Sequence, residues 1–144
     1  MDSAGLKAKV VVSLGILSSS MTDDIYGLAE AMTLSELKWT LPIDEVVDPF
    51  KMICMVKRAK RHVVEIFLTQ SAESIKHKQS SHDQKFDHYR TLIRDWDAEF
   101  KQALEDNYEL FAGVDPTQIF GTHVKAGFVY DGFGNDITSF LNGS

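Results

Sequence analysis

The chain has 144 residues, a net charge of −6 and 44% hydrophobic residues, which is the composition of a soluble globular protein long enough for one domain with a real core. Residues 82–144 hold eleven acidic side chains and five lysines or arginines, whereas residues 1–81 hold ten of each. An acidic surface repels phosphates, which argues against nonspecific wrapping of nucleic acid but suits a path along which DNA slides. Cys54 is the only cysteine, so an internal disulfide is excluded, and its apolar neighbours predict a buried side chain in a reducing cytoplasm.

The first apolar segment is VVVSLGIL, residues 10–17. It follows Lys7 and Lys9 and precedes three serines, an order that imitates a short secretory signal. The apolar run is short and Asp2 interrupts the basic start, so we expect a strand or a buried segment instead. The valine-rich start favours a strand, and the run is too short to span a bilayer.

Two short helical segments follow. Thr22 is a suitable N-cap, and Asp23 and Asp24 lie where a helix dipole favours carboxylates, which predicts a short helix over residues 23–32. A second short turn is expected over residues 35–39. Pro42 ends it, because the residue before a proline is pushed out of the helical region.

A long helix is predicted from Asp48-Pro49, a cap followed by proline at the first helical position, to about residue 74. With Lys57 placed at 0° and about 100° per residue, one apolar arc extends from about 180° to about 280°, the width of a core-facing stripe. The remaining arc is basic and is expected to form the polar face. The apolar arc contains Met52, Val56, Ala59, Val63, Ile66 and Phe67, and the basic arc contains Lys57, Arg58, Lys60, Arg61 and His62.

This basic run has three interpretations. It can be a solvated helix face, it can pair with acidic residues of the next long helix or of a neighbouring subunit, or it can contact phosphates directly. The third interpretation is weakened because no aromatic residue is interleaved for base stacking, and because both long helices exceed the length typical of a helix-turn-helix.

A second long helix is predicted from the capping box Ser81–Gln84 to about Asp106. Its polar face should carry the pairs Asp87–Arg90 and Asp97–Lys101. A heptad-like apolar stripe consists of Phe86, Tyr89, Ile93, Trp96, Phe100 and Ala103, flanked by Leu92 and Leu104. The predicted fold is therefore mainly α, an antiparallel hairpin of two long helices with a short N-terminal helix packed across it.

The last part of the chain has a different composition, so we divide the chain into a helical domain, residues 1–112, and a glycine- and aromatic-rich C-terminal arm, residues 113–144. The Asp131-Gly132 turn between apolar flanks predicts a β-hairpin or an extended arm. A lone hairpin is marginally stable, so the arm should pack on its own helices or on another subunit. Its aromatic candidates are Phe120, Phe128, Tyr130 and Phe133.

Histidines and carboxylates give no recognisable catalytic or metal-binding pattern. His77, His82 and His88 do not have zinc-site spacing, and His62-x-x-Glu65 lacks the second histidine of a metalloprotease helix. We therefore expect no metal.

The carboxylates Asp95, Asp97 and Glu99 are expected to form a solvated acidic face. Asp95 and Asp97 point about 200° apart on a helix, so they cannot act as an acid–base pair. A phosphate-binding glycine loop and a nucleophile elbow are also missing from the sequence. We therefore expect no enzyme and no cofactor.

Three segments together resemble the small head–tail connector proteins of tailed bacteriophages, which act as adaptors or head-completion proteins under the portal. The segments are MTLSELKWTLPID, PFKMICMVKRAKRHVVEIFL and FDHYRTLIRDWDAEFKQAL, and the resemblance extends over about residues 22–110. It implies a homo-oligomeric ring, a dodecamer matching the portal, that contacts the portal protein and the next neck or tail protein. DNA would pass through without specific binding, no membrane would be involved, and the protein would be made in the host cytoplasm and reside in the virion neck.

The resemblance also implies roles for the candidate residues. Subunit or portal contacts would come from Lys57, Arg58, Lys60, Arg61, Phe120, Phe128, Tyr130 and Phe133, and an acidic surface or lumen from Asp95, Asp97 and Glu99. The alternative function is a small helical DNA-binding or regulatory interaction module.

Overall fold

A computed structural model describes the backbone of residues 1–75 and 80–120 and the side chains of residues 1–71 and 86–120. These residues are mainly helical, which confirms the predicted mainly α class, and they contain no strand. The elements are α1 (Ser3–Leu14), the 3-10 helix η1 (Gly15–Ser20), α2 (Asp23–Leu37), α3 (Pro49–Ile75), α4 (Ser80–Asp106), the 3-10 helix η2 (Tyr108–Phe111) and α5 (Pro116–Phe120). The chain divides into a unit over Met1–Gly113 and a second unit from Val114 onward.

Residues 10–17, expected to be a strand or a buried segment, belong to helix α1 as far as Leu14 and then to η1. Leu6, Val10 and Leu14 are spaced four residues apart, which places them on one helical face, and all three are buried. The Asp2 side chain caps the helix by accepting from the Gly5 N–H at 2.8 Å. The strand prediction was wrong because the strand preference of valine depends on context, and a helix here buries this apolar row against α3.

Helix α2 begins as predicted at Thr22, whose hydroxyl accepts from the Ile25 N–H. It is longer than expected, because the first three residues of the turn predicted at residues 35–39 continue the same helix. The helix ends at Leu37, and Lys38 caps it in a left-handed conformation with φ of 60°, donating its N–H to the Leu34 carbonyl. The end of α2 is therefore a local cap that precedes Pro42 by several residues.

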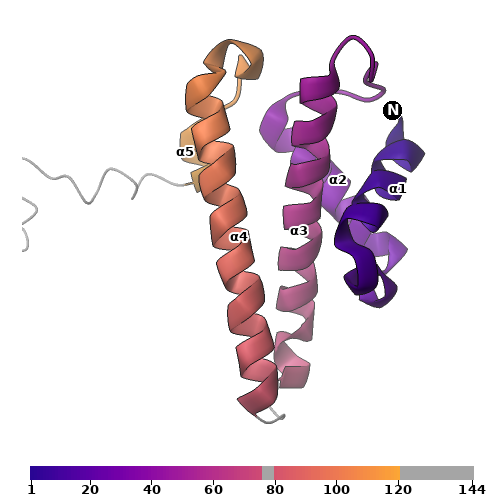
Figure 1. Cartoon of the computed structure of the whole chain (residues 1–144), viewed down its shortest axis with the longest axis vertical. Coiled ribbons are helices and arrows are strands. Elements are labelled where there is room, and N and C mark those ends of the chain that lie inside the picture. The colour runs from indigo at the N-terminus through magenta and orange to yellow at the C-terminus, as the bar shows by residue number, and fades with distance from the viewer. Residues whose placement is uncertain (76–79, 121–144) are drawn as a thin grey trace, which may run out of the picture. The chain divides into compact units, whose positions relative to one another are not determined.

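Helix α3 is the central element of the first unit and contacts α1, α2 and α4 (Figure 1). Its bounds agree with the predicted helix. In the predicted apolar arc, Ala59, Val63 and Ile66 are buried and the other three residues are half-buried. Burial extends beyond that arc, however, because Met55 and Val64 are also at most 1% exposed.

Helix α4 lies beside α3 (Figure 1). The predicted heptad-like apolar stripe of this helix is confirmed. Four of its residues are buried, namely Phe86, Ile93, Phe100 and Leu104, and the other four are half-buried, namely Tyr89, Leu92, Trp96 and Ala103. The Asp87–Arg90 pair is also present, at 3.3 Å. The side chains of the predicted capping box at residues 81–84 lie outside the described ones.

An aromatic cluster joins three segments at one end of the first unit. Phe111, in η2 after α4, stacks on Trp39 with ring centroids 5.3 Å apart and meets Phe50 and Phe100 edge-on at 5.8 Å. The end of α4 therefore lies near the beginning of α3 and the segment that follows α2. We call this end, with the loop of residues 38–48 and η2, the aromatic end.

In the second unit the structure describes α5, a short helix that was not predicted, with Phe120 half-buried. The hairpin or arm expected further on lies outside the described residues, as do Phe128, Tyr130 and Phe133.

Candidate functional site

The basic run of α3 is mainly an internal charge network rather than a solvated face. The Arg58 side chain is 4% exposed. Its Nε donates to Glu36 on α2 at 2.7 Å, and its Nη1 donates to Asp97 on α4 at 2.6 Å. The solvated-face prediction is therefore wrong for Arg58, because α3 is covered by helices on several sides and the polar arc also faces a neighbour.

Arg61 makes a bidentate contact with the same aspartate. Its Nε and Nη2 donate to the two carboxylate oxygens of Asp97, each at 2.9 Å, and its Nη1 lies 2.6 Å from Glu65 one turn along α3. Burial alone would lower the pKa of the Arg61 guanidinium, but the hydrogen bond and charge of Asp97 raise it overall. Of the three interpretations of the run, pairing with the next long helix therefore applies to Arg58 and Arg61.

His62 is the most deeply buried member of the run, with 1% exposure. Its Nε2 lies 2.7 Å from Glu36 Oε1, and its Nδ1 lies 3.2 Å from Arg61 Nη1. These contacts place the ring between the Glu36 carboxylate and the Arg61 guanidinium. His62 therefore belongs to the network and is not a surface residue.

Glu36 was not singled out from the sequence, although it is the partner that joins Arg58 and His62. Burial would raise the pKa of its carboxyl group, but the contacts with His62 and Arg58 and the positive charge of the Arg58 guanidinium lower it overall. Glu36 is therefore ionised at neutral pH. Because their guanidinium groups are held by carboxylates, Arg58 and Arg61 do not form a phosphate-binding surface.

The remaining basic candidates stay near the surface. Lys57 is exposed, and Lys60 is half-buried with its Nζ 4.7 Å from the centroid of the Trp96 ring. The acidic candidates also divide into surface residues and a residue of the charge network. Asp95 and Glu99 are exposed, as predicted, whereas Asp97 contacts α3. The predicted Asp97–Lys101 pair is replaced by the contacts of Asp97 with Arg58 and Arg61, which lie across the helix interface.

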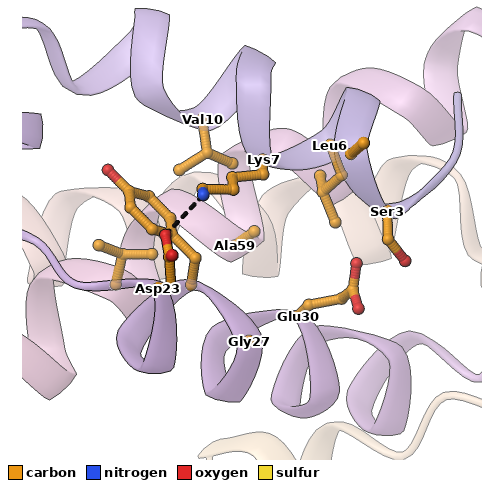
Figure 2. A pocket seen from close by; sticks show the side chains of 11 residues that line it. Ser3, Leu6, Lys7, Val10, Asp23, Gly27, Glu30 and Ala59 are labelled. Atoms are coloured by element: carbon orange, nitrogen blue, oxygen red, sulfur yellow. Dashed lines mark hydrogen bonds and ion pairs between the residues drawn. The ribbon is translucent and has the colours of Figure 1, made fainter.

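A groove of about 240 Å³ lies between α1 and α2, with α3 as its floor (Figure 2). Lys7 of α1 donates to Asp23 of α2 at 2.6 Å and links its two walls, while Ser3 and Glu30 face each other farther along. Ala59 lies at the floor, and Gly27 leaves the α2 wall open because no heavy atom lies within 4 Å of a Cβ built there. Of the charged residues at the groove, Lys7 and Asp23 pair with each other.

A smaller cavity of about 150 Å³ lies between α3 and α4, next to the charge network. Trp96, Phe100 and Cys54 contribute to an apolar wall, and Lys57 and Lys60 lie on its basic side. Cys54 is buried as predicted, and this burial raises the pKa of its thiol to about 11.

Large apolar side chains are exposed at the aromatic end. Val46 and Val47 are 89% and 72% exposed, and Tyr108 of η2 is 71% exposed. The two valines lie on an ordered turn, because their N–H groups donate to the Asp44 carboxylate at 2.8 and 3.1 Å. These hydrogen bonds also lower the pKa of Asp44. We call Val46, Val47, Tyr108 and Leu110 the apolar end surface.

Within the described residues, three or more histidine, cysteine, aspartate or glutamate side chains nowhere gather in a geometry that could hold a metal ion. Among the described helices, none is both long and apolar enough to cross a membrane. The chain matches no family model, no curated protein and no solved structure.

Proposed function

We propose that this chain is a structural adaptor that works by binding other proteins, of the head–tail connector kind that its helices resemble. In this proposal α3 and α4 form the antiparallel hairpin of a ring subunit, the C-terminal arm supplies a β-hairpin contact, and the ring docks on a portal protein and extends its DNA channel. The observation that carries the proposal is the apolar end surface. Large apolar side chains that stay exposed on a well-packed unit are available for contact with another protein, here from the loop before α3 and from η2.

The turn that carries Val46 and Val47 supports a binding role. Its backbone is already held by Asp44, and Lys9 of α1 pairs with Glu45 on the same turn at 2.9 Å. A partner would therefore bind a preformed apolar surface and would lose little conformational entropy on ordering it.

The exposed acidic residues of α4 support a channel-lining role. They are Asp95, Glu105 and Asp106, together with Glu99, which also borders the cavity between α3 and α4. Such carboxylates repel phosphates and let DNA slide without sticking. The basic run no longer serves as the main subunit contact in this proposal, because two of its arginines are used inside the subunit, and the apolar end surface takes that role.

The test is assembly with a portal protein encoded beside this chain, followed by native mass spectrometry. The wild-type chain should form a ring-sized complex, and the double variant Val46→Asp, Val47→Asp should form none while keeping its helical circular dichroism. Val12→Asp is the matched control, because Val12 is 81% exposed but lies on α1. Failure of the wild-type chain to bind any such portal would refute the proposal, as would normal assembly of the double variant. Salt-sensitive binding of duplex DNA would instead favour the DNA-binding alternative.

A further inference from the structure

The cavity between α3 and α4 has the size of a single ring. Its volume of about 150 Å³ is comparable to an apolar cavity that holds one benzene molecule. It is smaller than the sites that enclose drug-sized ligands. Its apolar wall comes from both helices and consists of Phe50, Ile53, Cys54, Trp96, Phe100 and Ala103.

Positive charge is concentrated at one side of this cavity. Lys57 and Lys60 line it from adjacent turns of α3, and among the described residues of the lining Glu99 is the only acidic one. The arginines that also reach the cavity are engaged by Glu36 and Asp97. Burial lowers the pKa of Lys60, the charge of Lys57 lowers it further, and Glu99 opposes the shift. The two ammonium groups therefore repel each other at the edge of an apolar space.

We propose that this cavity binds a small carboxylate whose apolar body is about one ring in size. The carboxylate lies between the Lys57 and Lys60 ammonium groups and removes their mutual repulsion. The apolar body lies against Trp96 and Phe100 and displaces water from their surface. The site is separate from the apolar end surface, so it stands or falls independently of the adaptor function.

The site contains its own reporter. The chain has two tryptophans, Trp39 and Trp96, so the Trp39→Phe variant leaves Trp96 as the single tryptophan. Titration of this variant with 3-phenylpropionate should give a saturable change in Trp96 fluorescence, with the millimolar affinity expected of so small a probe. The alcohol 3-phenylpropanol lacks the charge and acetate lacks the ring, so both should leave the fluorescence unchanged over the same range.

Variants test the two lysines and the apolar space of the cavity separately. In the Trp39→Phe background, Lys57→Gln with Lys60→Gln should weaken binding roughly tenfold, because two ammonium contacts are lost. The control Lys51→Gln removes a charge from the same helix outside the cavity and should change nothing. Ala103→Leu keeps both lysines and fills the cavity, so it should abolish the response.

Three results would overturn the proposal. They are no fluorescence response to 3-phenylpropionate, an equal response to 3-phenylpropanol, and equal affinities of the double glutamine variant and the Lys51→Gln control. The lysine substitutions lie at an exposed and a half-buried position, so circular dichroism should show the same helicity as the parent. The charge test therefore does not depend on whether Ala103→Leu folds.

Discussion

Replacing Asp97 by Asn tests the charge network that joins α3 to α4. The substitution keeps the shape of the side chain and removes the charge that accepts from Arg58 at 2.6 Å and from Arg61 twice at 2.9 Å. Removing one partner of a buried ion pair costs about 3–5 kcal/mol, because the other charge stays buried. The Asp97 side chain is 25% exposed and Arg58 keeps its contact with Glu36. We therefore expect a loss of about 2–3 kcal/mol in the free energy of unfolding.

The assay is urea unfolding followed by far-ultraviolet circular dichroism. Asp95→Asn is the matched control, since it makes the same chemical change on the same helix at an exposed position. It should alter the free energy of unfolding by no more than about 0.5 kcal/mol. The urea dependence of that free energy should be the same for both variants, because neither changes the surface exposed on unfolding.

Two outcomes would refute the network. Equal midpoints for Asp97→Asn and Asp95→Asn would mean that the guanidinium groups are solvated and that the basic run is a surface face after all. A double-mutant cycle with Arg61→Gln gives the second outcome. Arg61 and Asp97 should couple by about 1 kcal/mol or more, and additive effects would show that they do not interact.

Three further predictions concern single positions. Gly27→Ala should raise the free energy of unfolding by about 0.5–1 kcal/mol in the same urea assay, because Gly27 lies inside α2 and its added Cβ meets no atom within 4 Å. The folded-state pKa of Glu36 lies below its ordinary value of 4.5, so its contacts stabilise the fold above pH 4.5, and this stabilisation is lost as the pH falls through the folded-state pKa. Urea unfolding measured between about pH 5 and pH 3 should therefore show a smaller loss of stability for Glu36→Gln than for the wild type. Burial raises the pKa of Cys54 to about 11, so a thiol reagent at neutral pH should modify it much faster in urea than in the folded protein.

The long helices could be predicted because their signals are local. The Asp48-Pro49 start, the Thr22 cap and the apolar period from Phe86 to Leu104 each depend on residues within one or two turns. Helix α1 was missed because its valines were judged by strand preference, although Leu6, Val10 and Leu14 already show a helical spacing. Such a short segment takes its structure from the helices it packs against, and those contacts are absent from a local pattern.

The burial of Arg58 and His62 could not be predicted by dividing α3 into one apolar and one polar arc. That division assumes a helix with a single neighbour, whereas α3 contacts three helices. The sequence did contain a sign of this: Cys54, Val64 and Leu68 fall within the arc assigned to the cations, and all three are buried. The identity of the acidic partners remained out of reach, because Glu36 and Asp97 are each more than 20 residues away from Arg58 and meet it only through the fold.

The charges within the bundle are better explained as determinants of helix position than as sources of stability. Apolar residues of similar size often stabilise a core as well as a buried ion pair does. Arg58, however, requires one carboxylate from α2 and one from α4, at 2.7 and 2.6 Å. A shift of α4 by one turn, about 5.4 Å, would break the contact between Arg58 and Asp97, while apolar side chains of the two helices would still pack against each other. The register that the network selects is also the one that places Trp96 beside Lys60 and Phe100 beside Phe111. The cavity between α3 and α4 and the apolar end surface therefore both depend on the contacts of Arg58 with Glu36 and Asp97.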